Sequence, residues 1–354
     1  TVIDTVTAAI NPRSDTLAYR FHIGNRPGTL DQWAQVTARG RASGNRASIL
    51  FDQQNIDGRT GYRLGFIARW MPDGIKVRVV PSHPVIGYKN WTVNDSNFVS
   101  INTALKHFDA DLSMKSSESS IHLYTDHDSR TDSTQEDLIL DIDNIRIAEW
   151  IALNPFAPPV SGNLSADMRF GWDHRSINGN GTISLDDLNY NRQRVGSFGL
   201  DVSLLTNKSG TVQANATLLV DSIRTITAEG NLNDSTASNP FLLDFKMIHF
   251  PLNVLNPFLP KDMARLSGTL NGTMDITGSL SEPIFNGYLD FDSTTLTVPM
   301  LGTAYRFSSQ KIPMDSNIVT FNNYTITGAN SNPLSVNGHI DARHISDILV
   351  DLKA

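Results

Sequence analysis

Two stretches of the chain alternate strictly between apolar or glycine residues and polar residues. They run from Val160 to Trp172 and from Leu266 to Gly278. Because successive side chains of a β-strand point to opposite faces, each stretch predicts a long strand with one apolar and one polar face. Neither stretch has apolar residues at helical spacing. The function of the chain therefore depends on what the apolar face covers.

Shorter apolar runs predict further strands through the first half of the chain. A Met71-Pro-Asp-Gly turn between two apolar runs predicts a hairpin. Leu30–Thr37 has apolar residues at helical spacing and predicts a short helix, whereas the polar segment Asp126–Glu136 predicts a loop. The other strands are predicted at Val2–Ile10, Leu17–Ile23, Ala47–Phe51, Gly61–Trp70, Ile75–Val80, Tyr88–Val93, Phe98–Ile101, Phe108–Met114 and Ile121–Tyr124.

The second part of the chain contains an internal repeat. Val160 matches Leu266 at an offset of 106 (266 − 160), and Leu153-Asn-Pro-Phe156 recurs as Leu255-Asn-Pro-Phe258 at an offset of 102 (255 − 153). Each Leu-Asn-Pro-Phe motif is predicted to end a short helix before its proline. The predicted organisation is a β-rich portion at 1–137, a first repeat at 138–247 with a helix at 147–156, and a second repeat at 248–354 with a helix at 251–258, truncated at the C-terminus.

An apolar sheet face must be covered by a second sheet, by helices, by curling of the sheet or by a ligand. A sandwich or closed barrel is the simplest solution and stays open at this point. Three features favour an open sheet: the strands are long, glycine and alanine among the inward residues leave room, and a repeat allows lengthwise growth. The predicted fold class is all-β with a few short helices, as an elongated, repeat-built, U-shaped (taco-like) sheet with an apolar inner groove.

Acyl chains are the predicted occupants of this groove. Transfer of one sixteen-carbon chain into water costs about 13 kcal/mol at ~0.8 kcal/mol per CH₂, and a continuous apolar lining removes most of that cost. The predicted groove residues are Leu164, Met168, Phe170, Ile183, Leu185, Leu266, Leu270, Met274, Ile276, Leu289 and Phe291.

Composition and charge narrow the classes of partner. The 354 residues contain no cysteine and carry a net charge of −7. Residues 1–90 hold 12 Lys/Arg against 6 Asp/Glu, a net of +6, and the remainder holds 17 against 30, a net of −13. A basic end could lie near anionic headgroups or nucleic acid, but without a cluster along the sequence it is typical of a solvated surface, and no nucleic acid is expected. No apolar run has the length of a membrane span.

No group of residues indicates catalysis, so the chain is predicted not to be an enzyme and to need no cofactor. His122 lies near His127, Asp126, Asp128 and Asp132, but these residues match neither a calcium loop nor a zinc site, and no metal is expected. Two acidic pairs, Asp186-Asp187 and Asp290/Asp292, are expected at strand ends in solvent. Nucleophile elbows and phosphate-binding glycine loops are absent from the sequence.

The repeats resemble the translocation and assembly module (TamB) family of the AsmA-like superfamily. The resemblance rests on Phe250–Pro260, Leu266–Gly278, Ser281–Gly287 and Tyr288–Thr303, and is looser over 150–200. It implies a groove that spans the periplasm, an inner-membrane anchor in an N-terminal part missing from this chain, and a TamA-type outer-membrane barrel as partner. The implied roles are phospholipid transport between the inner and outer membranes and assembly of outer-membrane proteins. The chain is thus expected to be a segment of a longer periplasmic protein.

Two other functions remain open from the sequence. A scaffold could bind outer-membrane protein or adhesin strands along its free strand edges, by β-augmentation. Alternatively, the chain could be an extracellular β-sandwich repeat for adhesion, which requires closed, paired sheets.

Overall fold

The structure is a computed structural model that describes most of the chain. The described residues are 5–24, 35–55, 57–103, 107–126, 136–151, 158–172, 176–207, 209–232, 241–260, 263–279, 282–328, 332–343 and 347–353.

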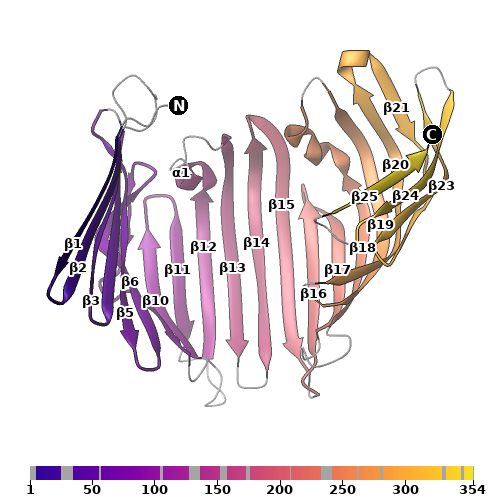
Figure 1. Cartoon of the computed structure of the whole chain (residues 1–354). Coiled ribbons are helices and arrows are strands. Elements are labelled where there is room, and N and C mark those ends of the chain that lie inside the picture. The colour runs from indigo at the N-terminus through magenta and orange to yellow at the C-terminus, as the bar shows by residue number, and fades with distance from the viewer. Residues whose placement is uncertain are drawn as a thin grey trace. The chain divides into compact units, whose positions relative to one another are not determined.

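The described residues are almost entirely antiparallel β-sheet, which confirms the all-β fold class with a few short helices (Figure 1). By their hydrogen bonds the strands are assigned to one sheet, and most strands pair with the strands next to them in the sequence. The chain forms two compact units, Thr1–Gly171 and Trp172–Ala354, which are described separately below.

Unit 1 contains the strands from β1 to β13 and the helix α1. In Figure 1, β10–β13 are seen face-on and β1–β5 nearly edge-on, so the sheet of this unit is curved. The elements are β1 (Thr5–Arg13), β2 (Thr16–Gly24), β3 (Gln35–Ser43), β4 (Arg46–Gln54), β5 (Thr60–Met71), β6 (Gly74–Ile86), β7 (Lys89–Asn90), β8 (Thr92–Val93), β9 (Phe98–Asn102), β10 (His107–Lys115), β11 (Ser120–Asp126), β12 (Glu136–Arg146), α1 (Ile147–Ile151) and β13 (Val160–Trp172).

Unit 2 contains the strands from β14 to β25 and two 3-10 helices. The elements are β14 (Ile177–Tyr190), β15 (Gln193–Thr206), β16 (Val212–Val220), β17 (Ile223–Leu232), β18 (Phe241–Pro251), η1 (Leu252–Phe258), β19 (Arg265–Gly278), β20 (Pro283–Val298), η2 (Pro299–Leu301), β21 (Thr303–Phe307), β22 (Ile312–Asp315), β23 (Ile318–Thr327), β24 (Pro333–Asp341) and β25 (Leu349–Lys353).

The predicted strands of the first half are largely confirmed, including the hairpin in which Met71 lies opposite Gly74. The predicted helix at Leu30–Thr37 is wrong where it can be checked, because residues 35–37 begin β3, and residues 30–34 lie outside the described residues. The predicted strand Tyr88–Val93 is interrupted at Trp91, whose side chain turns into the core. The interior of the predicted loop Asp126–Glu136 also lies outside the described residues.

Both predicted short helices occur, with corrected extents. α1 covers the start of the predicted helix 147–156, and residues 152–157 are outside the described part. The second is a 3-10 helix that continues through Pro257 instead of ending before it. The side-chain amide of Asn256 stabilises this turn, because its Oδ1 accepts from the N–H of Leu266 (2.7 Å) and its Nδ2 donates to the Leu266 carbonyl (2.8 Å).

β-bulges interrupt several of the long strands. The bulge residues Asp187, His249, Ser293 and Asn323, and Asn144 near the end of β12, all have φ between 47° and 50°. Four of them donate their backbone N–H to a side chain of the following strand: Asn144 to Ser165 Oγ, Asp187 to Ser197 Oγ, His249 to Asn271 Oδ1 and Asn323 to Asn337 Oδ1. Asp187 and Ser293 are 106 residues apart, as are Ser165 and Asn271, so the repeat is structural as well as sequential.

The acidic pairs do not lie at strand ends as predicted. Asp186 and Asp187 lie inside β14, and Asp290 and Asp292 lie inside β20. The bulges at Asp187 and Ser293 allow the strands to continue past these carboxylates, because the extra residue shifts the pairing without ending it.

Candidate functional site: an apolar sheet face in each unit

In unit 1 the strand register gathers apolar side chains on one face of the sheet, which we call the apolar face of unit 1. Phe21 lies opposite Ala38, Ala38 opposite Phe51, and Phe51 opposite Leu64. Directly opposed residues point to the same side of a sheet. The same register continues from Ile75 and Ile101 on β6 and β9 to two apolar pairs on β11 and β12, Ile121 with Ile142 and Leu123 with Leu140, and then to Thr125 with Leu138.

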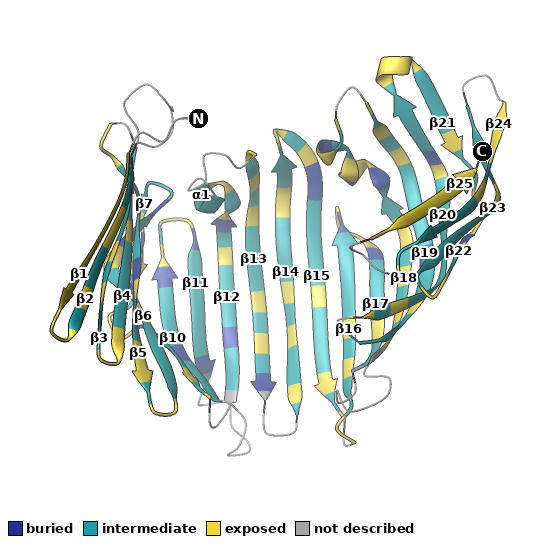
Figure 2. Ribbon diagram, in the orientation of Figure 1, coloured by how far each residue is buried: buried dark blue, intermediate teal, exposed yellow. Residues whose placement is uncertain are grey.

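Part of this face is exposed to solvent. Phe21, Phe51, Phe66, Trp70 and Ile101 are 46%, 42%, 38%, 49% and 39% exposed, although large apolar side chains are usually buried. In the part of the chain that the structure describes, the main contacts of these strands are with neighbouring strands of their own sheet, and no second layer packs over them. In Figure 2 the strands β1–β4 are coloured mostly as exposed and intermediate. Exposed large apolar side chains that share one face of a sheet are typical of a binding surface.

The other part of the apolar face is closed by a core. Ile86 at the end of β6, and Trp91 and Val93 from the segment that follows it, are at most 2% exposed and pack with Tyr62 and Met114. Trp150 of α1 lies edge-on to Trp91, with ring centroids 5.9 Å apart. Leu164, one of the predicted groove residues, packs against this core and is half-buried. The predicted residues Met168 and Phe170 are also half-buried on β13.

An ion network holds α1 over this core. Lys89 Nζ lies 2.8 Å from Glu149 Oε1 and 3.0 Å from Glu118 Oε2, and the Tyr62 hydroxyl donates to the Glu149 carbonyl. Hydrogen bonds to Glu149 and Glu118 raise the pKa of Lys89, and the bond from Lys89 lowers the pKa of Glu118. The network therefore fastens the covering helix to β7 and to the turn between β10 and β11.

Unit 2 has an apolar face of the same construction, on which the other predicted residues lie. Leu270 is opposite Phe291, and Leu266 opposite Leu296. Met274 and Ile276 pair with Gly287 and Phe285, and Leu289 with Gly272. Ile183 and Leu185 on β14 are opposite Leu200 and Phe198. All these side chains are half-buried, not buried as in a closed sandwich core.

A short helix also covers one end of the apolar face of unit 2. Val254 of η1 is 4% exposed and packs with Val195 and Val220. The ring of Phe258 lies 4.7 Å from that of Tyr190. Further along the face, the ring centroid of Phe291 lies 5.0 Å from that of Phe307 and 6.5 Å from that of Tyr324. The Leu-Asn-Pro-Phe motif of the second repeat thus supplies part of a cover.

The inward glycines do not leave open room, which corrects the prediction from sequence. A Cβ at Gly272 would lie 2.7 Å from Leu289 Cδ2, and one at Gly230 would lie 2.8 Å from Leu243 Cδ2. Leucine side chains of the paired strands already lie over these glycines. Space on the apolar faces therefore comes from the absence of a second layer over the described strands, not from small residues.

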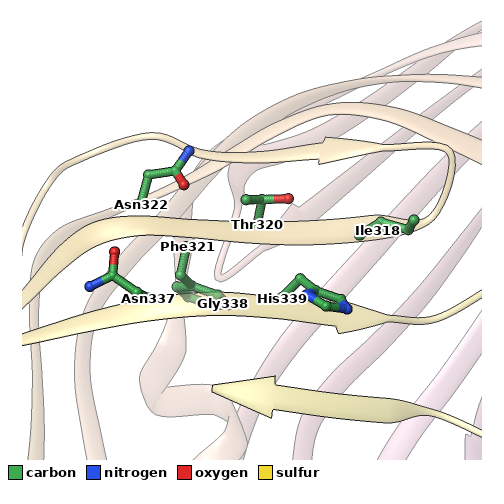
Figure 3. Close-up of a pocket in the computed structure, with 7 residues that line it drawn as sticks. All are labelled: Ile318, Thr320, Phe321, Asn322, Asn337, Gly338 and His339. Carbon is green, nitrogen blue, oxygen red and sulfur yellow. The ribbon is translucent and has the colours of Figure 1, made fainter. Parts of the chain in front are cut away.

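The described residues hold no group of three His, Cys, Asp or Glu side chains that could bind a metal ion, and no helix among them has the length and hydropathy to span a membrane. His122 stacks on Tyr124 at 4.2 Å, whereas Asp128 and Asp132 lie outside the described residues. A depression over β23 and β24 (Figure 3) has a mixed lining of polar and apolar residues: Ile318, Thr320, Phe321, Asn322, Asn337, Gly338 and His339.

The exposed aromatic part of the apolar face of unit 1 was not among the predicted site residues. The signal was present, because Tyr62, Leu64, Phe66, Ala68 and Trp70 occupy every second position of β5. On β3 and β4 the residues of the same face include alanine, glycine and glutamine, so the alternation of apolar and polar residues is weak there.

Comparisons with protein-family models, with curated proteins and with solved structures found no match to this chain.

Proposed function

We propose that the apolar faces of the two units shield lipid acyl chains and so support phospholipid transport between membranes. The observation that carries this proposal is the exposed aromatic surface of unit 1, formed by Phe21, Phe51, Phe66 and Trp70 with no second layer on the described strands.

The magnitude of the hydrophobic effect favours an apolar occupant. Burial of apolar surface stabilises by about 25 cal/mol per Å², and burial of each acyl CH₂ contributes about 0.8 kcal/mol. Aliphatic and aromatic side chains offer no directional contacts, so a chain could slide along the strands without a deep minimum. Most polar side chains of the strands point to the opposite face, as in β13, where residues 161, 163, 167 and 169 are exposed.

The finer form of the proposal is a U-shaped, taco-like groove that is part of a periplasm-spanning bridge. It is supported by the structural repeat of the bulges and by the resemblance of the repeats to the TamB family. In this proposal the parent protein is anchored to the inner membrane and meets a TamA-type barrel at the outer membrane. The chain itself acts as a conduit, not as an enzyme.

A second candidate is supported by the free edges of the sheet. Among the described strands, β1 pairs only with β2, and all nine residues of β1 are exposed. Such an edge could accept a strand of an outer-membrane protein during its assembly. A β-sandwich adhesion repeat is less well supported, because it needs two packed sheets and the described strands belong to one.

Lipid extraction from the purified protein tests the main proposal. We expect phospholipid in stoichiometric amount from protein purified gently from a bacterial periplasm. The Phe66→Asp variant should carry less of it, because the carboxylate would lie on the apolar face of unit 1. Ile67→Asp is the matched control, since Ile67 neighbours Phe66 on β5 but points to the polar face, opposite Ser48 and Arg78.

Lipid-free wild-type protein, or equal lipid on both variants, would count against the acyl-chain proposal. The edge alternative has a separate test in Ala8→Pro. Arg13 and Thr16 form the hydrogen-bonded pair that closes the turn between β1 and β2, so by alternation the N–H of Ala8 points to the free edge, where proline removes it. Loss of peptide-strand binding in this variant, with its lipid content unchanged, would favour the scaffold function.

A further inference from the structure

The polar face of β1–β6 carries a dense set of cations. Of the 12 Lys/Arg in residues 1–90, nine lie on these strands and point away from the apolar face of unit 1. We call this surface the basic face; its residues are Arg13, Arg20, Arg39, Arg41, Arg46, Arg63, Arg69, Lys76 and Arg78. The cations alternate with apolar residues and come from six strands, so they form no cluster in the sequence.

The register places several of these cations directly opposite one another. Arg46 lies opposite Arg69, and Arg69 opposite Lys76, on three successive strands. Arg20 lies opposite Arg39. Directly opposed like charges destabilise a sheet. Nothing in a solvated surface without a partner offsets this repulsion between the opposed cations, so the arrangement indicates an anionic partner.

Carboxylates do not neutralise the basic face. Asp52 is the one acidic residue on this face of strands β1–β6, and it already pairs with Arg63 at 2.6 Å. In the part of the chain that the structure describes, Arg39, Arg41, Arg46 and Arg69 form no ion pair, and all four are exposed. Lys76 lies over the Phe98 ring, 3.5 Å from its centroid.

We propose that the basic face binds the surface of an anionic phospholipid bilayer. Eight of its nine cations are arginines, whose planar guanidinium groups bind phosphate oxygens in pairs. Strands lie about 4.8 Å apart, so cations spread over six strands span roughly 24 Å, enough to meet several headgroups at once. This inference goes beyond the acyl-chain proposal and does not depend on it.

The distribution of aromatic residues favours a bilayer over a nucleic acid. Single-stranded nucleic acid is usually held by aromatic side chains that stack on bases. In β1–β6 the tyrosine, phenylalanine and tryptophan side chains lie on the apolar face: Tyr19, Phe21, Phe51, Tyr62, Phe66 and Trp70. A helix or two-stranded ribbon that could enter a DNA groove is also absent from this face of the described strands.

Vesicle flotation with the whole chain tests the proposal. We expect binding to phosphatidylcholine vesicles that contain phosphatidylglycerol, weaker binding in high salt, and little binding to pure phosphatidylcholine. The variant with Arg39→Gln, Arg41→Gln, Arg46→Gln and Arg69→Gln should bind several-hundred-fold more weakly, because each cation near an anionic surface contributes about fivefold. Its circular dichroism spectrum should match that of the wild type, since the changes remove like-charge repulsion at exposed positions.

The matched control neutralises four exposed cations of unit 2, with Arg224→Gln, Lys246→Gln, Arg306→Gln and Lys353→Gln. It has the same net charge as the test variant and should bind vesicles like the wild type. Equal weakening of both variants, or binding that ignores phosphatidylglycerol, would overturn the proposal. Tighter binding to a DNA duplex than to vesicles, lost in the first variant alone, would instead assign the basic face to nucleic acid.

Discussion

Two tryptophans of unit 1 provide a sharp test of the division between a closed and an open part of its apolar face. Trp91 is 1% exposed in the core under α1, whereas Trp70 on β5 is 49% exposed. A buried tryptophan covers about 200 Å² of surface, which corresponds to about 5 kcal/mol at ~25 cal/mol per Å². Trp91→Ala should therefore destabilise by about 3–5 kcal/mol, the range usual for large-to-small core changes.

Trp70→Ala should lower the free energy of unfolding much less than Trp91→Ala. Only about half of its area is buried, and water can fill the vacated space, so about 1–2 kcal/mol is expected. Trp91→Phe is a useful intermediate, because the indole N–H of Trp91 is buried with no hydrogen-bond partner among the described residues. Removal of an unpaired buried donor offsets part of the lost packing, so this variant should be close to neutral.

Urea unfolding monitored by tryptophan fluorescence is the suitable assay. Four of the five tryptophans, at positions 33, 70, 91 and 150, belong to unit 1, so the signal reports mainly on that unit. If Trp70→Ala were as destabilising as Trp91→Ala, Trp70 would be part of a dry core. The open apolar face, and with it the acyl-chain proposal, would then lose its basis.

Three further predictions concern charge and packing. Lys89→Met should remove the hydrogen bond that lowers the pKa of Glu118. A lowered carboxyl pKa stabilises the folded state at pH values above the ordinary pKa of about 4.3, and this stabilisation is lost as the pH falls. The difference in Tm between wild type and variant should therefore shrink below pH ~4. A difference independent of pH would contradict this. Arg343 holds the pKa of Asp341 at about 2 through side-chain and backbone hydrogen bonds. In Arg343→Gln, NMR of the Asp341 carboxyl group should show titration near the ordinary pKa of about 3.9. An ordinary pKa already in the wild type would refute the pairing. Gly40→Ala should lower Tm, because its Cβ would lie 1.9 Å from the Ser48 carbonyl oxygen and 2.6 Å from the Tyr19 ring, whereas Gly199→Ala, with its nearest contact at 3.6 Å, should not.

The positions of the long strands could be predicted because the alternation of apolar and polar residues determines them locally. In β13 and β19 each apolar residue alternates with a polar one, and no competing helical pattern exists, so type and extent were both predictable. The helix expected at Leu30–Thr37 does not form at residues 35–37, which the structure describes. There Val36 pairs with Ile23 and Gln53 on the two adjacent strands, and this pairing outweighs the helical spacing of the apolar residues.

The faces themselves were only partly predictable. The groove residues of the repeats share their expected faces, because alternation fixes the side of a strand within a continuous run. The basic face could not be predicted, since Arg46, Arg69 and Lys76 become neighbours only through the pairing of β4, β5 and β6. Residues far apart in sequence meet by register, and register depends on turns and bulges that composition does not specify.

Each bulge changes which positions of its strand, odd or even, point to the apolar face. Ile183 and Leu185 point to the apolar face from odd positions, but beyond Asp187 the same face is reached from even positions, by Leu188 opposite Gly196. Phe321 and Tyr324 are related in the same way across Asn323. Deletion of a single bulge residue would thus turn every later side chain of its strand to the wrong side. A chain built in this way tolerates changes of residue or of whole repeats far better than insertions or deletions of one residue, and its length is expected to evolve in steps of about a hundred residues.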